Sequence, residues 1–227
     1  MEPIRQQWIP QAVAGKSFIE VGGLWGVVNE QVTTAHAAGA TSLTQIDPGG
    51  EDLWESFRQR CSAAQINDYK CIVGDINDPA LTAAVEPADV VHCSGVLYHC
   101  PHPLYTLQQL RRLTKQTLLL GCATIPERVA NTAGELRLES GSALFVPATS
   151  PSQLSVLAHY MAEVGARHIP GIDQVLPDGW RVTDYGPWWW YFTPRFVESL
   201  LTLAGFRVRY MSPYWCSHAT YYWASPN

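Results

Sequence analysis

Short apolar runs that end in turn residues alternate along this chain with longer amphipathic stretches. The runs with this strand-like pattern are 17–21, 42–46, 71–75, 88–96 and 117–125. Between them, 104–115 places leucines three residues apart and 27–38 lacks both glycine and proline, so each of these stretches predicts a helix. Strands that alternate with helices indicate a parallel sheet covered by helices on both faces.

The end of the chain departs from this alternation. A helix is predicted over 194–204, with Thr193 as its cap and Pro194 at its first position. Two strand-like runs follow, 207–215 and 217–225, and a short turn joins them. They predict an antiparallel hairpin at the edge of the sheet, which then has seven strands, five of them parallel.

A long irregular segment separates the fifth strand from this last helix. Residues 123–192, the lid segment, contain one predicted helix, 151–164, among loops spaced by proline and glycine. Irregular segments of this length within a compact domain are typical of functional lids. We therefore expect one domain, residues 1–227, into which the lid segment is inserted.

Three acidic residues follow predicted strands. Glu20 lies at the end of the first strand, before the turn Gly22-Gly23-Leu24-Trp25-Gly26, whose spacing does not match the glycine pattern of nicotinamide- or flavin-binding proteins. Asp47 ends the second strand and Asp75 the third. Because the carboxyl ends of parallel strands meet at one edge of a sheet, these carboxylates predict a single ligand crevice.

With these motifs the chain resembles the class I S-adenosylmethionine-dependent methyltransferases, from about residue 16 to the C-terminal hairpin. FIEVGGLWG is similar to their first motif, TQIDP to the motif with the ribose-binding acid, and GDI to the motif with the adenine-contacting acid. The run ADVVHCSGVLYHCPHPLYTLQQLRRLT resembles their fourth motif and the helix after it. The resemblance implies a Rossmann-like α/β fold, with S-adenosylmethionine as methyl donor and S-adenosylhomocysteine as product.

The resemblance also assigns residues to the donor site. It implies that Glu20 faces the methionine amino group, Asp47 the ribose and Asp75 the adenine. The full set expected to bind the donor is Glu20, Gly22, Gly23, Gly26, Asp47, Pro48, Asp75, Ile76, Ser94 and Gly95. Two departures from the family pattern stand in the first motif, where Leu24 replaces the middle glycine and Trp25 is bulky.

Aromatic residues point to the acceptor, since fourteen of the 25 lie between residues 185 and 223. The residues expected to line a pocket for a flat, apolar or aromatic acceptor are Tyr98, Trp188, Trp189 and Tyr191. His99, in the loop after the fourth strand, is the leading candidate for a general base, and His159 on the predicted lid helix is the second. The histidines interpreted as structural are His36, His92, His102 and His218.

Charge and composition narrow the classes of partner. The net charge is −5 and only three lysines occur, which disfavours a nucleic-acid surface. The six cysteines lack metal-ligand spacing, so no metal is expected, and most, such as Cys71, lie in apolar runs where we expect free, buried thiols. No apolar run approaches the ~20 residues of a membrane span, and no secretory signal is recognised, so a cytoplasmic location is expected.

These features together predict a methyltransferase that acts at oxygen or nitrogen of a small organic acceptor. One alternative is an RNA methyltransferase, because the VLYH loop followed by a Pro-Leu pair is especially similar to the subgroup that contains the tRNA wobble-uridine methyl- and carboxymethyltransferases. The other alternative is a non-catalytic binding subunit with the same fold, whose donor pocket Leu24 and Trp25 fill.

Overall fold

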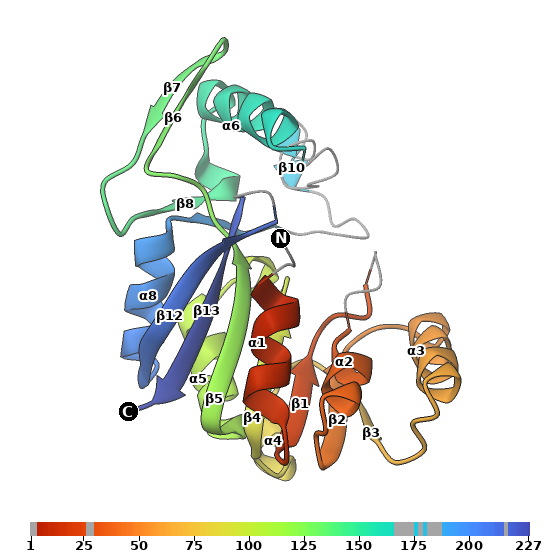
Figure 1. Ribbon diagram of the computed structural model, residues 1–227. Coiled ribbons are helices and arrows are strands. Elements are labelled where there is room, and N and C mark those ends of the chain that lie inside the picture. The colour runs from red at the N-terminus through yellow and green to blue at the C-terminus, as the bar shows by residue number, and fades with distance from the viewer. Residues whose placement is uncertain (1–3, 26–29, 166–174, 177–178, 181–187, 216–217) are drawn as a thin grey trace.

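The computed structural model describes residues 4–25, 30–165, 175–176, 179–180, 188–215 and 218–227. Within them, one seven-stranded sheet has the order β12-β13-β5-β4-β1-β2-β3 (Figure 1). Its strands are β1 (Ser17–Val21), β2 (Ser42–Asp47), β3 (Lys70–Val73), β4 (Ala88–Ser94), β5 (Thr114–Ala123), β12 (Phe206–Tyr214) and β13 (Ala219–Pro226). The first five pair in parallel, and β12 and β13 pair antiparallel, which confirms the predicted sheet and its Rossmann-like class.

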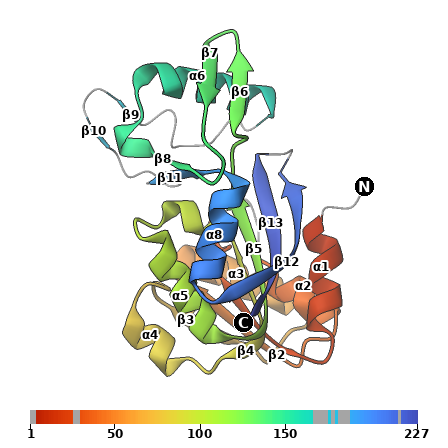
Figure 2. The ribbon, with the colours of Figure 1, turned by 90° about the vertical axis from the view of Figure 1, so that its left-hand side faces the viewer.

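Helices cover both faces of this sheet (Figure 2). One face carries α1 (Ile4–Val13), α2 (Val32–Ala37) and α3 (Glu51–Ala63), and the other carries α4 (Pro79–Ala84), α5 (Pro103–Leu113) and α8 (Pro194–Leu203). On the α1 face, Ile9, Trp54 and Phe57 pack with Phe18 of β1 in one buried cluster. On the other face, three of the leucines predicted to form an apolar stripe, Leu107, Leu110 and Leu113, are buried in α5.

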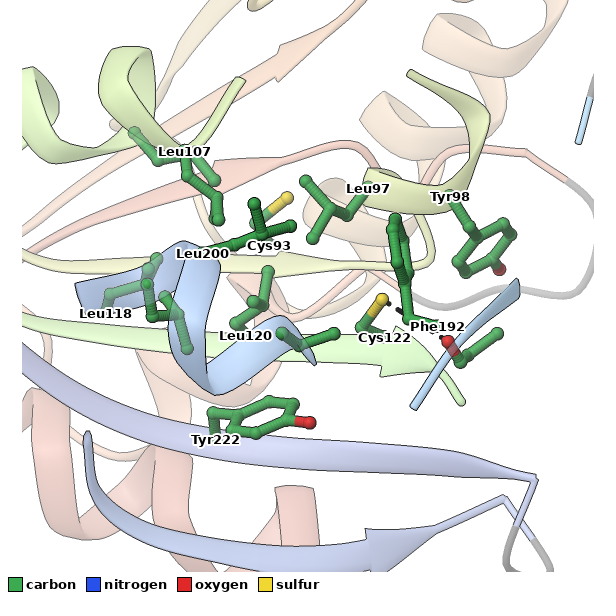
Figure 3. Packing of buried hydrophobic residues seen from close by; sticks show 14 of the residues in the cluster. Cys93, Leu97, Tyr98, Leu107, Leu118, Leu120, Cys122, Phe192, Leu200 and Tyr222 are labelled. Carbon is green, nitrogen blue, oxygen red and sulfur yellow. Dashed lines mark hydrogen bonds between the residues drawn. The ribbon is translucent and has the colours of Figure 1, made fainter. Parts of the chain in front are cut away.

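The cluster on the opposite face is the larger of the two, and Figure 3 shows its centre. Leu107 of α5 and Leu200 of α8 pack with Leu118 and Leu120 of β5, while Tyr222 of β13 closes the same layer. Full burial of each such leucine contributes about 1.5–3 kcal/mol of transfer free energy. This cluster fixes β4 and β5, from whose carboxyl ends the loops of the site emerge.

The lid segment forms a second lobe beyond the carboxyl end of β5 (Figures 1 and 2). Its described elements are β6 (Arg128–Asn131), β7 (Gly134–Arg137), β8 (Ala143–Phe145), η2 (Val146–Ala148), α6 (Pro151–Glu163), β9 (Val175–Leu176), β10 (Gly179–Trp180) and β11 (Trp190–Phe192). Helix α6 begins with a capping box made by Ser150 and Gln153, and the Asn131 side chain joins β6 to it at the Val156 carbonyl, 2.8 Å away. Strand β11 pairs with β8 and so returns the chain to α8.

Four sequence predictions need correction. The helix predicted over 27–38 is described only as Val32–Ala37, and residues 26–29 lie outside the described residues. The third strand ends at Val73, so Asp75 lies in the turn after it. The Thr193 hydroxyl does not cap α8, because it donates to the Ser142 carbonyl at 2.8 Å. Cys71 is exposed because β3 is the edge strand.

Candidate active site

The turn after β1 brings its backbone close to the neighbouring strands. Gly22 and Gly23 have φ angles of +81° and +92°, which glycine adopts without strain. The Gly22 N–H donates to the Ile46 carbonyl at 2.8 Å. A Cβ at Gly22 would lie 2.5 Å from Val96 Cγ2, so this position excludes a side chain. Gly26 lies outside the described residues, and its place in the donor site stays a prediction.

Asp47, at the end of β2, is buried and holds the glycine turn in place. Its Oδ1 accepts the Gly49 N–H at 2.7 Å, and its Oδ2 accepts the Leu24 N–H at 3.2 Å. The Trp25 indole donates a third hydrogen bond to this carboxylate. Burial raises the pKa of Asp47, and the N–H donors act in the opposite direction. Pro48, which follows it, is exposed.

The remaining predicted donor residues follow β3 and β4. Asp75 is exposed, and its Oδ1 accepts the backbone and side-chain N–H groups of Asn77 at 2.8 and 3.0 Å. Ile76 is buried beside it. Ser94 ends β4 with a buried hydroxyl that has no hydrogen-bond partner among the described residues, and Gly95 follows with φ of +79°. The predicted donor residues that the structure describes therefore follow four adjacent strands, β4, β1, β2 and β3.

Glu20 forms a buried pair with a histidine that sequence analysis interpreted as structural. Both carboxylate oxygens of Glu20 lie within 2.9 Å of His92 Nδ1, and the two side chains are 1% and 0% exposed. Burial, together with repulsion from Glu30, raises the pKa of Glu20 well above its ordinary value. Burial lowers the pKa of His92 well below its ordinary value. Strand pairing places Glu20 directly beside His92, a neighbour that residue spacing does not reveal.

Aromatic rings gather at the loop after β4, on the acceptor side predicted from the sequence. Tyr98 and His99 belong to the short helix η1 (Leu97–His99), and their ring centroids are 4.3 Å apart. The Trp188 ring lies 4.1 Å from that of Tyr98 and 5.6 Å from that of His99. The Tyr98 hydroxyl lies 3.5 Å from the position of a Cβ at Gly95. The structure therefore brings Tyr98, His99 and Trp188 together. They lie beside the carboxyl edge of strands β4, β1, β2 and β3, where the predicted donor residues are and which we call the donor edge.

The other predicted acceptor residues are less accessible or lie elsewhere. Trp188 and Tyr191 are 4% and 0% exposed, so neither presents an open face to an acceptor. Trp189 is half-buried and stacks on Phe145, with 6.0 Å between ring centroids. His159 lies on the exposed side of α6, where its Nδ1 faces the carbonyl one turn earlier at 2.9 Å, and no described contact joins it to η1.

The β12–β13 hairpin adds residues that sequence analysis missed. Trp215 has φ of +44°, a strained conformation for a residue with a side chain, and its ring lies 3.6 Å from the position of a Cβ at Gly95. The His218 ring stacks on Trp215 with 6.2 Å between centroids. The place of these residues near the site could have been predicted, because an antiparallel hairpin after a parallel strand turns at the carboxyl edge of the sheet. The strained backbone of Trp215 could not have been predicted from the sequence pattern.

Neither a membrane span nor a metal-ligand cluster occurs among the described residues. No helix in that part of the chain is long and apolar enough to cross a membrane. No group of three or more histidine, cysteine or carboxylate side chains in the described ranges is placed to hold a metal ion.

Comparison with known proteins identifies the kind of domain. A family model described as a methyltransferase domain matches residues 20–119, which include the glycine turn, the three strand-end acids and η1. A ubiquinone biosynthesis O-methyltransferase of Actinobacillus pleuropneumoniae serotype 7 (strain AP76) is 27% identical over 129 residues. The match covers 55% of this chain and 53% of that relative, so the chain spans about half of the relative's length.

Solved structures share the fold at low sequence identity. A magnesium protoporphyrin IX methyltransferase of Synechocystis PCC 6803 with bound S-adenosylhomocysteine aligns with a TM-score of 0.59 and 13% identity, over 98% of this chain and 84% of that one. A 1,6-didemethyltoxoflavin-N1-methyltransferase of Burkholderia thailandensis, with 1,6-didemethyltoxoflavin and S-adenosylhomocysteine bound, aligns with a TM-score of 0.59 and 10% identity, over 100% and 80%. The donor product is thus present in both of these neighbours. By the match over residues 20–119 and by its fold, the chain is similar to methyltransferases, including two whose solved structures hold S-adenosylhomocysteine.

Proposed function

We propose that this protein transfers a methyl group from S-adenosylmethionine to an oxygen or nitrogen of a small, flat organic acceptor. The observation that carries the proposal is the placement of Glu20, Asp47 and Asp75 at or just beyond the carboxyl ends of three adjacent parallel strands, around a turn with two glycines at positive φ. Carboxylates at this edge suit a donor that carries an ammonium, a sulfonium and a ribose diol.

The contacts of Asp47 support its role toward the ribose. An ionised carboxylate has about four acceptor positions. Two backbone N–H groups use one each, and the Trp25 indole uses a third. A ribose diol needs two positions, so in this account Trp25 leaves Asp47 when the donor binds. The backbone donors from Leu24 and Gly49 stay and keep the carboxylate aimed at the turn.

The acceptor would lie between η1 and the β12–β13 turn. Tyr98 approaches Gly95 with its hydroxyl but is only 6% exposed, so the half-buried Trp215 ring, which also approaches Gly95, is the aromatic wall proposed for a sulfonium and a flat acceptor. When bound, the donor supplies an electrophilic methyl group, which an in-line displacement moves to the acceptor while the sulfur keeps the bonding electron pair. The protein's part is to hold the two reacting atoms in line, about 3–3.5 Å apart, and to exclude water.

His99 is the proposed base, because its ring adjoins Tyr98 at the mouth of this space. A neutral imidazole would take the proton that a hydroxyl acceptor loses as the new bond forms. Replacing His99 with asparagine should lower turnover about 100-fold at neutral pH while the dissociation constant for S-adenosylhomocysteine changes less than threefold. Unchanged turnover with a confirmed hydroxyl acceptor would remove His99 from this role. The same substitution at exposed His159 is the matched control.

The lid segment is proposed to cover the acceptor. Its strand β11 follows Trp188 and Trp189, and the Trp189 N–H donates to the Tyr98 carbonyl at 2.9 Å. The Trp190 indole also donates to the Pro101 carbonyl at 3.3 Å. These bonds join the end of the lid segment to the loop after β4, which carries His99 and begins at the donor edge. The proposed acceptor contacts would therefore lie next to the donor edge.

An assay of transfer tests this function directly. Purified protein with labelled S-adenosylmethionine would be offered a panel of aromatic hydroxy and amino compounds, and transferred label would be measured. We expect transfer to at least one flat acceptor and none by Asp47→Ala. Donor binding without transfer to any acceptor class would favour the non-catalytic alternative instead.

An RNA acceptor is the second candidate, favoured by the VLYH loop that forms η1 beside the donor edge. The net charge of −5 opposes it. Filter binding with bulk tRNA at 50 and 200 mM salt separates the two, since a phosphate-binding surface of six or more contacts loses affinity about 10³-fold over this range. No retention at either salt concentration is expected for the small-molecule enzyme.

A further inference from the structure

Glu20 and His92 form a buried, hydrogen-bonded pair of titratable side chains. His92 Nδ1 lies 2.9 Å from Oε1 and 2.8 Å from Oε2 of Glu20, so one ring nitrogen spans both oxygens. The pair borders the glycine turn, because Glu20 Oε1 lies 3.0 Å from the position of a Cβ at Gly23. Glu20 therefore contacts both the glycine turn and His92.

We propose that His92 is a positioning residue of the donor site. Together with Glu20 it holds one extra proton while the site is empty, and the pair releases that proton when the donor's ammonium binds to Glu20. This inference rests on the proposed function, because it requires that Glu20 faces the ammonium.

The surroundings of the pair favour a neutral state in the empty site. Glu30, whose carboxylate is also buried, and Asp47 repel a charge on Glu20, and Arg5 of α1 attracts it. Burial is the largest effect and acts against charge on both partners, raising the pKa of Glu20 and lowering that of His92. The backbone N–H of Gln31 donates to Glu20 and only partly offsets these effects.

Two further groups face the pair from the hairpin strands. Tyr221 of β13 lies with its ring 5.8 Å from that of His92, and the Tyr214 ring of β12 lies tilted against that of Tyr221, with 5.4 Å between centroids. Burial raises the pKa of both phenols, so they stay neutral at physiological pH. The Arg5 guanidinium lies over the Tyr214 ring, 5.7 Å from its centroid. Arg5 is therefore the cation among the groups named here, and Glu30 and Asp47 are the anions.

The far side of the His92 ring limits its protonation. Nε2 is buried and has no hydrogen-bond partner among the described residues. An imidazolium would place a charged N–H at this position, where burial without a partner is most costly. In the empty site the pair is thus a neutral acid that donates to Nδ1, with the ring proton on Nε2.

Donor binding changes this balance. An ammonium next to Glu20 favours the carboxylate, as any opposite charge at short distance does. In the bound state the pair is a Glu20 carboxylate and a neutral imidazole whose Nδ1–H donates to it, and the one proton that the pair loses goes to solvent. One proton leaves per donor bound, and affinity rises with pH until the empty pair has already lost that proton.

Calorimetric titration with S-adenosylhomocysteine, run at each pH in two buffers that both buffer there and differ in ionisation enthalpy, counts the released protons. At pH 6 we expect about one proton released per ligand bound, and fewer at pH 8.5. Binding with no proton release at any pH would overturn the proposed pair. No binding at any pH would instead overturn the donor site itself, so the two failures are distinguishable.

Two variants and a spectrum separate positioning from simple packing. His92→Asn keeps an N–H donor to Glu20 and should bind S-adenosylhomocysteine within threefold of the parent at pH 8, whereas His92→Leu should bind more than tenfold more weakly. Nitrogen-15 NMR of the imidazoles, with His92→Asn assigning the signal, should show the Nε2–H form give way to the Nδ1–H form on binding. Equal affinity of the leucine variant, or an unchanged tautomer, would contradict the proposal. His36→Asn, at an exposed histidine, is the matched control for the calorimetry.

Discussion

At the scale of single residues, the donor site is held by hydrogen bonds that its own loop supplies. Asp47 accepts N–H groups from Leu24 and Gly49 before any ligand is present. The Leu24 side chain is 5% exposed and packs in the core on the α1 face, so the residue that replaces the family's middle glycine contributes its backbone to the site. Trp25, in contrast, is 46% exposed and reaches Asp47 with its indole.

Replacing Trp25 with phenylalanine should therefore tighten donor binding. The variant keeps an aromatic ring and removes the N–H that competes with the ribose for Asp47. Loss of one competing hydrogen bond is expected to lower the dissociation constant for S-adenosylhomocysteine about three- to tenfold, measured by calorimetry. Trp8→Phe, in the aromatic cluster against β13, is the control and should leave affinity unchanged. Weaker binding by Trp25→Phe would mean that the indole contacts the donor itself.

At the scale of elements, the strands are held in register at the edge opposite the site. Asp89, at the start of β4, accepts the backbone N–H of Ser17 at 3.0 Å and its hydroxyl at 2.8 Å, and the Gln116 side chain donates to it at 2.9 Å. These bonds join β1, β4 and β5. They lower the pKa of Asp89, with the backbone N–H of Ser17 as the largest cause.

Asp89→Ala should therefore reduce stability without changing donor binding. We expect the free energy of unfolding to fall by about 1 kcal/mol at pH 7, since the hydrogen bonds are half-exposed. Because the folded carboxyl has the lower pKa, its contribution is present above the ordinary value and is lost as pH falls through the lowered value. Urea unfolding at pH 7 and pH 3 measures this difference. A variant as stable as the parent at pH 7 would contradict the assigned bonds.

The sequence predicted these elements to different degrees. Strands β1, β2 and β4 were predicted within two residues because each is an apolar run followed by turn residues. Strand β5 begins at Thr114, three residues before its predicted start. It opens with the polar run Thr114-Lys115-Gln116, which lacks the apolar pattern used to predict strands. The edge position of β3 had no signal in its own residues, so Cys71 was assigned to the core.

The residues of the candidate site were also predictable to different degrees. The positions of Glu20, Asp47 and Asp75 near the ends of adjacent strands were predictable because each lies at or just after the end of an apolar run. Their partners were not, because His92 reaches Glu20 through pairing of strands 72 residues apart. The contact of Trp25 with Asp47 depends on a side-chain rotamer, and the approach of Trp215 to Gly95 depends on a left-handed backbone. Neither property is encoded in residue spacing.

At the scale of the whole molecule, a sheet with its helices provides the donor edge and the lid segment forms a separate lobe above it (Figure 2). The two are joined where Thr193 holds Ser142 and where the Trp189 N–H donates to the Tyr98 carbonyl. The net charge of −5 and the buried acids beside the glycine turn suit a cationic donor and a small acceptor better than a phosphate backbone. In the proposed function, the lid segment and η1 would select the acceptor.

The measurement that tests the central claim most directly is calorimetric titration of the intact protein with S-adenosylhomocysteine, repeated with Asp47→Ala and Asp89→Ala. The account predicts micromolar binding by the parent, a loss of at least about 30-fold in Asp47→Ala, where the ribose loses a charged acceptor, and unchanged affinity in Asp89→Ala. Equal affinity in the parent and in folded Asp47→Ala would contradict the assigned donor site.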